Sequence, residues 1–232
     1  MKQKISWGKL LIEAFVIGGS ILLAFGIDAW WEERSDRQEE RIALSRLHGE
    51  FRNSTERLGP STGRGNYTAT IEILELLQDY QNDDSALAVP NSMIVQMLGV
   101  PTFDRVTPVL DGLIQSGNLS LIQDEDVLSS ISIWQRDIIQ LSEAQQDARR
   151  STYELLIPAL TIRGNLSKPL SIFPPNLQSD PTEGDSYLSV DSELLGLVAN
   201  RVRHLEGISR AVERLRASTQ SVIKAIEQVE DN

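Results

Sequence analysis

The most apolar stretch of the chain is a single run near its N-terminus, from Leu10 to Trp31. A helix over these 22 residues would be roughly 33 Å long, enough to cross the ~30 Å hydrocarbon core of a bilayer. Trp7 precedes the run, and Trp30 and Trp31 close it, where amphipathic rings favour the headgroup level. We therefore predict a transmembrane helix with these three tryptophans as interfacial anchors.

Two other interpretations of the run stay open. It could be a secretory signal, because Lys2, Lys4 and Lys9 form a basic start and Ala24-Phe25-Gly26 resembles a cleavage site. It could also be a helix buried in a soluble core. The membrane anchor is favoured over the signal because Glu13 fits poorly in the apolar region of a signal peptide.

One side of the predicted membrane helix carries small and polar residues. At about 100° per residue, a single contact face is formed by Glu13, Ile17, Ser20, Ala24 and Asp28. Small side chains let helices approach closely in lipid, and a buried polar atom there is best satisfied by a partner. We expect this face to pack against another membrane helix, unless both acids are simply solvated at the two interfaces.

Beyond the run, apolar residues recur at helical spacings of three and four. The segment 32–41 is charged without an apolar face, so we expect it to continue the first helix into water. From Ile42 this helix is expected to become amphipathic, and it should end at Leu58-Gly-Pro. Further helices are expected over 71–80, from Pro90, from Thr107 to Gly117, and from Asp124 to Pro158. No segment alternates as a strand would, although residues 119–122 could form a short extended piece.

The last helix is expected to open at Asp191 and to carry a heptad seam. The seam residues are Leu205, Ile208, Val212, Leu215, Val222 and Ile226. Such a seam forms either one wall of an antiparallel bundle or a self-associating coiled coil. Five prolines mark residues 158–190 as an irregular excursion. We predict an all-α fold, with a tail and transmembrane anchor over 1–31 that continues into an elongated antiparallel helical bundle over 32–232.

Two motifs together resemble a known family. The first is LLIEAFVIGGSILLAFGIDAWWEER, and the second, about 80 residues later, is VLDGLIQSGNLSLIQDEDVLSSISIW. This pair resembles an uncharacterised group of bacterial single-span membrane proteins, in which a helix ending in Ser-Gly-x-Leu-x-x-Ile leads into another helix. The matching positions are Leu113, Ser116, Gly117, Leu119, Ile122, Leu128 and Trp134. The resemblance implies a membrane anchor plus a helical domain, without a known activity.

Charge narrows the possible partners. The chain has 232 residues and a formal net charge of −11, which repels phosphates and anionic lipid headgroups and so disfavours both nucleic acid and docking on a membrane surface. No cysteine is present, so disulfides and thiolate chemistry are excluded. Basic residues are almost balanced on the two sides of the run, and the positive amino terminus favours a tail inside the cell. We therefore expect a single-pass protein of the bacterial inner membrane with a periplasmic domain.

The sequence suggests no catalytic, cofactor or metal site. His48 and His204 lack the i,i+4 partner that a zinc helix needs, and the Gly59–Gly65 loop lacks the ending of a phosphate loop. The acidic clusters lack calcium-loop spacing. We therefore expect a non-enzymatic membrane-anchored scaffold or assembly subunit. It would bind a protein partner or form a homo-oligomer through its membrane helix and seam. The alternative is a sensory or ligand-binding bundle that signals through a partner's membrane helix.

Overall fold

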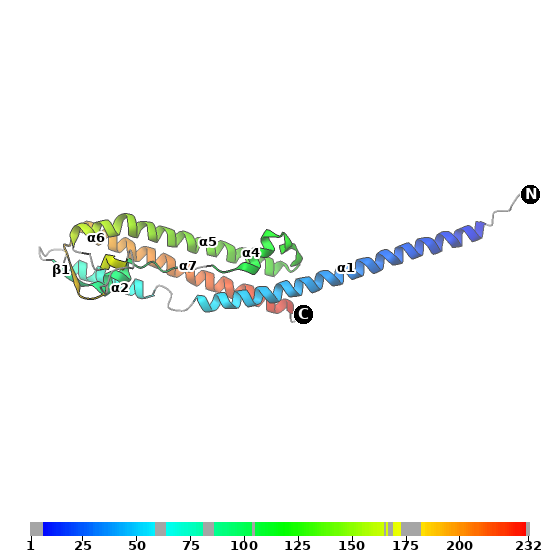
Figure 1. Cartoon of the computed structure of the whole chain (residues 1–232), viewed down its shortest axis with the longest axis horizontal. Helices are drawn as coiled ribbons and strands as arrows, with labels where there is room; N and C mark the ends of the chain where they lie inside the picture. Colours follow the sequence, from blue (N-terminus) through cyan, green and yellow to red (C-terminus); the bar gives the residue numbers. More distant parts are fainter. Residues whose placement is uncertain are drawn as a thin grey trace, which may run out of the picture.

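The fold is a long helical bundle from which the first half of one helix projects (Figure 1). This computed structural model describes residues 7–58, 64–80, 86–103, 105–164, 166, 169–172 and 182–230. Residues 7–14, 16, 17, 171 and 172 are described by their backbone alone. The chain is mostly helical, so the predicted all-α class is confirmed at that level.

The elements follow in chain order, with helices interrupted by one small sheet. They are α1 (Trp7–Arg57), α2 (Arg64–Asp79), β1 (Leu87–Pro90), α3 (Asn91–Leu98), α4 (Pro108–Gln115), the 3₁₀ turn η1 (Asn118–Leu121), α5 (Glu125–Ser151), the π-helical turn η2 (Thr152–Leu156), α6 (Ile157–Arg163), the 3₁₀ turn η3 (Pro169–Ile172), β2 (Asp185–Leu188) and α7 (Ser192–Glu230).

Three long helices form the shaft of the bundle. Helices α5 and α7 pack along each other, and the second half of α1 lies along the C-terminal half of α7 (Figure 1). The first and last long helices of the chain therefore pack side by side. Both helices carry single-face apolar seams, and mutual packing removes these seams from water.

The core is divided into two hydrophobic clusters along α7. One cluster joins α1, α4, α5 and the C-terminal half of α7 around the buried Trp134 and Phe51. The other joins α2, α3, the sheet, α6 and the start of α7 around Leu194 and Val198. Between the two clusters α7 places the buried guanidinium of Arg201. The bundle therefore has two apolar cores separated by a polar layer.

Several local predictions were wrong. Residues 119–122 do not form an extended piece, because Asn118–Leu121 is a 3₁₀ turn. The helix expected to end at Pro158 ends as an α-helix at Ser151 and continues through the π turn into α6, which ends at Arg163. Pro158 lies in the first turn of α6, directly after the π turn, so the helical chain continues past this proline.

A small sheet was also not expected. β1 and β2 pair antiparallel, with Leu87 opposite Leu188 and Pro90 opposite Asp185. β2 lies within the excursion predicted over 158–190, which is otherwise only partly described. Gly164 lies against this sheet so closely that an added Cβ would be 2.6 Å from the backbone oxygen of Tyr187. A side chain at Gly164 would therefore push β2 away.

Helix termini follow the predicted capping signals. The Asp124 side chain accepts a hydrogen bond from the Val127 amide at 2.9 Å, and Asp191 accepts one from the Leu194 amide at 2.7 Å. After α4, Gly117 takes a left-handed conformation with φ of 76°, which an L residue adopts only with strain.

The N-terminus of α4 is capped by a residue from another helix. Glu50 of α1 is buried, and its carboxylate accepts hydrogen bonds from the amides of Val109 at 2.7 Å and Leu110 at 3.1 Å. A carboxylate at a helix N-terminus also meets the positive end of the helix dipole. Glu50 therefore ties α4 to α1 with charge-assisted bonds.

Replacing Glu50 should loosen α4. Glu50→Ala is expected to lower the free energy of unfolding by about 2–3 kcal/mol, because both amides lose a charged acceptor. Thermal unfolding of the full chain in detergent measures this loss. Glu56→Ala, an exposed acid on the same helix, is the control and should change stability little. Equal stability of the two variants would contradict the role given to Glu50.

The same carboxyl predicts a pH dependence. Burial raises the pKa of Glu50 above its usual 4.5, against the opposing effect of the two amide bonds. The folded state therefore holds this proton more tightly than the unfolded state, and stability falls as the pH rises from about 4.5 through the folded-state pKa. The stability of the wild type relative to Glu50→Gln should therefore decrease over that window. A pH-independent difference would contradict this prediction.

Candidate functional site

The most unusual surface of the molecule is the first half of α1, which leaves the bundle as an unbroken helix (Figure 1). Among the described side chains of α1, the first buried one is that of Ala43. From there on, Leu44, Leu47 and Phe51 are buried in the shaft of the bundle. The helix is therefore fixed at its C-terminal half and free of the bundle before residue 40.

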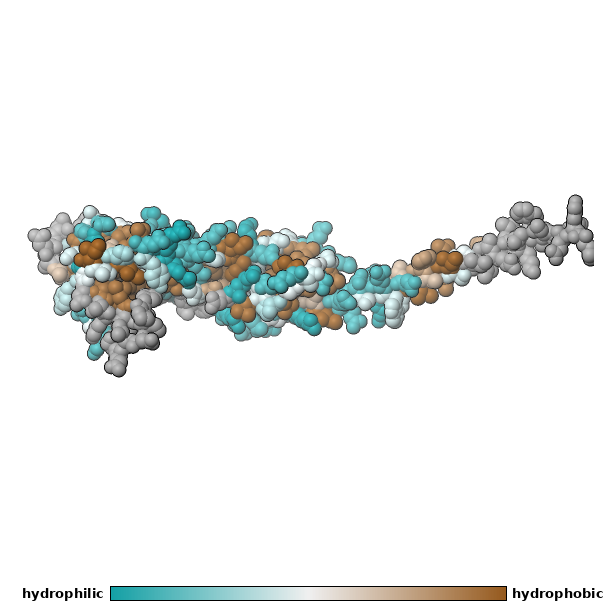
Figure 2. Space-filling view, turned by 45° about the horizontal axis from the view of Figure 1, so that its top comes forward, coloured by the Kyte–Doolittle hydropathy of each residue, from teal (hydrophilic) through white to brown (hydrophobic). Residues whose placement is uncertain are grey.

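The described part of the projecting half begins with an exposed apolar segment. The exposed fraction is 83% for Phe15, 74% for Leu22 and 68% for Phe25. Successive residues such as Ile21, Leu22 and Leu23 point to different sides of the helix, so apolar surface surrounds it. Figure 2 shows this apolar segment beyond the body of the bundle, separated from it by a hydrophilic collar. A helix that is apolar all round is one that a core or a membrane normally covers.

Part of the predicted membrane span lies outside the residues whose side chains are described. These residues are 10–14, 16 and 17, and they include Glu13 and Ile17 of the contact face; the side chain of the anchor Trp7 is likewise outside. Across the described stretches of the chain, no helix combines the length and the apolar character needed to span a bilayer.

The remaining residues of the predicted contact face lie on the projecting helix. Ser20, Ala24 and Asp28 are all exposed. On the same segment, a Cβ added to Gly18, Gly19 or Gly26 would meet no atom within 4 Å. Among the described residues, this face therefore has room for the close approach of a neighbouring helix.

The predicted interfacial anchors Trp30 and Trp31 end the apolar segment. They are 56% and 65% exposed, and their ring centres lie 5.7 Å apart. The guanidinium carbon of Arg34 lies 5.9 Å from the centre of the Trp30 ring, within the range of a cation–π contact. An aromatic pair and a cation therefore meet at the point where the helix changes from apolar to charged.

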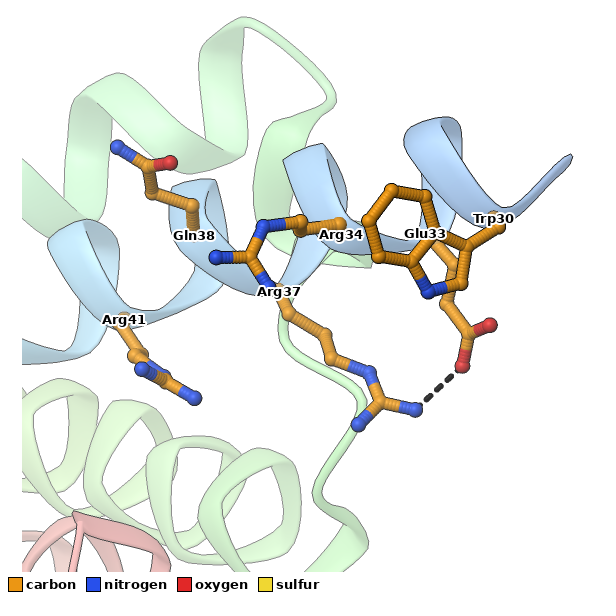
Figure 3. A pocket seen from close by; sticks show the side chains of 6 residues that line it. All are labelled: Trp30, Glu33, Arg34, Arg37, Gln38 and Arg41. Carbon is orange, nitrogen blue, oxygen red and sulfur yellow. Dashed lines mark hydrogen bonds and ion pairs between the residues drawn. The ribbon is translucent and has the colours of Figure 1, made fainter. Parts of the chain in front are cut away.

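The charged segment 32–41, which we call the stalk, separates its charges onto different faces. At about 100° per residue, Arg34, Arg37 and Arg41 fall within roughly 60° of one another and form an arginine face. Figure 3 shows this face, where an open hollow of about 360 Å³ is lined by Trp30, Glu33, Arg34, Arg37, Gln38 and Arg41. Glu32, Asp36 and Glu39 lie on the opposite side of the helix.

Two contacts fix the stalk to the end of the bundle. The Glu40 carboxylate accepts a hydrogen bond from the Gln123 amide at 2.7 Å, just before α5. One helical turn into the bundle, the ring of His48 lies 3.2 Å from a carboxylate oxygen of Glu227 on α7. The contact of Glu40 and that of His48, which lies just beyond the stalk, therefore set the direction of α1 relative to α5 and α7.

The predicted seam of the last helix is buried in the shaft. Leu205, Ile208, Val212, Leu215, Val222 and Ile226 are each at most 4% exposed. All except Leu205 belong to the cluster shared with α1, α4 and α5. Within the chain as described, the seam thus forms a wall of the bundle.

The polar layer between the two cores was missed by the sequence analysis. Arg201 is 1% exposed and donates to the carbonyl oxygens of Met97 at 2.9 Å, Gly99 at 2.6 Å and Ala148 at 3.4 Å. Burial lowers its pKa to about 10, so the guanidinium stays charged at neutral pH. The sequence does carry a signal for this buried charge, because the spacing of the seam extends back to Arg201, four residues before Leu205.

Each of the two histidines lies beside a polar side chain of a helix. His204 is half-buried and lies 3.2 Å from the Asn200 amide nitrogen, and burial lowers its pKa. Within the described residues, no group of three or more histidine, aspartate or glutamate side chains is placed to hold a metal ion. The predicted irregular excursion over 158–190 lies partly outside the described residues.

Comparisons with protein-family models, with curated proteins and with solved structures gave no match to this chain. The resemblance to bacterial single-span membrane proteins therefore stays a prediction.

Proposed function

We propose that this protein is a non-enzymatic membrane-anchored scaffold or assembly subunit that acts through helix–helix contacts. In this proposal the apolar segment of α1 lies in the bacterial inner membrane. The stalk carries the bundle on the extracytoplasmic side, and the contact face around Ser20 and Ala24 meets a partner helix or a second copy. From Trp31 to Ala43 the stalk would hold the bundle about 18 Å from the interface.

The single observation that carries this proposal is the continuity of α1. One helix of 51 residues joins an apolar segment exposed on every side to a half that is built into the core through Leu44, Leu47 and Phe51. Exposed apolar surface of this extent is unfavourable in water and favours a lipid or protein environment. The rigid connection also means that anything bound by the projecting half is held at a fixed position relative to the bundle.

Charge in the apolar segment should release the protein from membranes. The double variant Leu22→Arg/Phe25→Arg places two cations near the middle of the predicted span, where each costs about 2.5–3.5 kcal/mol of insertion free energy. We expect wild-type protein to stay in the membrane pellet after an alkaline carbonate wash and the variant to be mostly released. The matched control is Ile162→Arg/Tyr187→Arg, which changes two exposed residues of the bundle and should stay in the pellet.

Two outcomes would contradict the membrane proposal. One is release of the wild type by the same wash. The other is a mature chain whose mass shows cleavage after Gly26, which would identify the run as a secretory signal. Thermal unfolding of all variants in detergent checks that the bundle itself stays folded.

A sensory function is the second candidate, and the specific observation that favours it is the same unbroken helix. A shift at one end of α1 would be transmitted to its other end, because a helix is a stiff element. Native purification in mild detergent separates the two functions. A stoichiometric protein partner supports assembly, whereas a co-purifying small molecule supports sensing.

A further inference from the structure

We propose that the arginine face of the stalk binds the phosphate groups of phospholipid headgroups where α1 leaves the bilayer. This inference rests on the membrane anchoring proposed above and adds the class of ligand. The binding residues are Arg34 and Arg37, with Arg41 contributing at longer range.

The position of the face along the helix fits the headgroup layer. The Cα atoms of Arg34 and Arg37 lie about 4.5 Å and 9 Å beyond that of Trp31, and the polar layer of one leaflet is about 5–8 Å thick. Side chains on a helix tilt toward its N-terminus, which here is the direction of the membrane. The salt bridge that Arg37 makes to Glu33, one turn back, follows that tilt (Figure 3). Both guanidinium groups can therefore reach phosphate oxygens.

The chemistry of the face fits a phosphate. A guanidinium offers a planar fork of N–H donors that matches phosphate oxygens, and it remains charged in every physiological condition. The stacking of Arg34 near the Trp30 ring orders one of these forks beside an aromatic residue that itself favours the interface. Arg41 lies about 15 Å beyond Trp31, so it acts through its field over the Debye length of about 8–10 Å.

The net charge of −11 opposes anionic headgroups at long range, but of the acids of the stalk only Glu33 adjoins this face. Glu32 and Asp36 lie on the opposite side of the helix, and Glu33 is the only acid lining the hollow among the described residues. The Glu33–Arg37 pair is 60–65% exposed, and exposed ion pairs contribute only about 0–1 kcal/mol. A phosphate can therefore displace Glu33 from Arg37 at little cost.

An acidic protein helix is the competing occupant. It is disfavoured because the arginine face adjoins the tryptophans and the apolar segment, and so lies at the level of the headgroups if the helix spans the bilayer. The hollow is lined by α1 alone in the described structure, and it lies open along one side of the helix.

Lipid retention by the full chain tests this inference. Purified protein in detergent is given equal amounts of phosphatidylglycerol and of a diacylglycerol with the same acyl chains, and bound lipids are counted by native mass spectrometry. The two lipids differ only in the phosphate-bearing headgroup. We expect wild type to retain phosphatidylglycerol about fivefold over diacylglycerol, and Arg34→Gln/Arg37→Gln to lose that preference.

The control variant is Arg52→Gln/Arg57→Gln, which removes two exposed arginines from the bundle part of the same helix and should keep the preference. Equal retention of the two lipids by wild type, or an unchanged preference in Arg34→Gln/Arg37→Gln, would overturn the inference. A third outcome would also overturn it. In native membranes, Arg34→Gln/Arg37→Gln would lose a crosslink to an acidic protein while its retention of phosphatidylglycerol stays unchanged. Flotation of Arg34→Gln/Arg37→Gln with phosphatidylcholine vesicles tests the anchor without the arginine face, so failure of the anchor and failure of the arginine face can be told apart.

Discussion

Trp134→Ala should lower the free energy of unfolding by about 3–5 kcal/mol, one of the largest losses expected from a single substitution in this chain. The Trp134 side chain is 1% exposed and joins three helices. Its ring meets that of Phe51 from α1 edge-to-face, with 5.1 Å between centres, and its Nε1 donates to Thr219 Oγ1 of α7 at 3.1 Å. Truncation removes the edge-to-face pair and leaves a cavity where α1, α5 and α7 meet.

Thermal unfolding of the full chain in detergent measures this loss, which corresponds to a melting temperature lower by about 10 °C for a chain of this size. Trp134→Phe keeps most of the packing and loses the N–H donor, so it should cost less than half as much. Trp31→Ala is the matched control, because that ring is 65% exposed and lies outside the bundle. A melting curve of Trp134→Ala that coincides with that of Trp31→Ala would mean that this junction does not hold the shaft together.

Features with local causes were predictable from the sequence. Asp124 and Asp191 cap the helices that follow them because their side chains reach amides only three residues away. The end of α1 before Leu58-Gly-Pro follows from the same local rules. The seam of α7 was visible because its period of three and four residues repeats over many turns.

Features that depend on distant partners were not predictable. Each strand of the sheet has four residues, too few for an alternating pattern, and the paired residues Leu87 and Leu188 are 101 positions apart in the chain. The cap that Glu50 supplies to α4 joins residues 59 and 60 positions apart, so no local signal marks it. Pro158 lies within a continuous helical stretch, directly after the π turn, although a proline on its own predicts the end of a helix.

The candidate site was predictable in part from the sequence. The apolar run, the tryptophans and the change to charged residues at Glu32 can all be seen in the sequence. The separation of the stalk charges could also have been found from helical spacing, but their number suggested only a solvated helix. The common face became informative because Arg34, Arg37 and Arg41 are exposed, and because Arg34 and Arg37 lie on the part of α1 that is free of the bundle.

Arg201 shows how a seam position can carry a charge. In the period of α7 it falls between Val198 and Leu205, where an apolar residue would be expected. Its guanidinium instead meets carbonyls of Met97 and Gly99 at the end of α3, which the helix itself leaves unpaired and which carry the negative end of its dipole. The third carbonyl, that of Ala148, also accepts from Thr152 Oγ1 where α5 passes into the π turn. One side chain therefore joins three helices at the layer between the two cores.

Two opposing effects decide how removal of the Arg201 guanidinium changes the free energy of unfolding. Burying a guanidinium without a carboxylate is unfavourable, and burial alone lowers its pKa to about 10. Against this, each hydrogen bond from a charged donor contributes about 1.5–3 kcal/mol, and removing the donor loses all three bonds, although the carbonyls of Gly99 and Ala148 keep bonds from Asn66 Nδ2 and Thr152 Oγ1. Two of the three bonds are short, at 2.6 Å and 2.9 Å, so we expect the hydrogen bonds to win.

Arg201→Ala should therefore lower the free energy of unfolding by about 3–5 kcal/mol, measured by denaturant or thermal unfolding of the full chain in detergent. Arg201→Lys should lose less, because an ammonium keeps the charge and some of the bonds but cannot reach three carbonyls with a planar fork. Arg203→Ala, at an exposed position of the same helix, should change stability by no more than about 0.5 kcal/mol. The decisive variant is Arg201→Met, which keeps much of the volume and removes the charge. If Arg201→Met unfolds at or above the wild-type temperature, the desolvation of the guanidinium outweighs its hydrogen bonds. The polar layer would then lower the free energy of unfolding of the bundle.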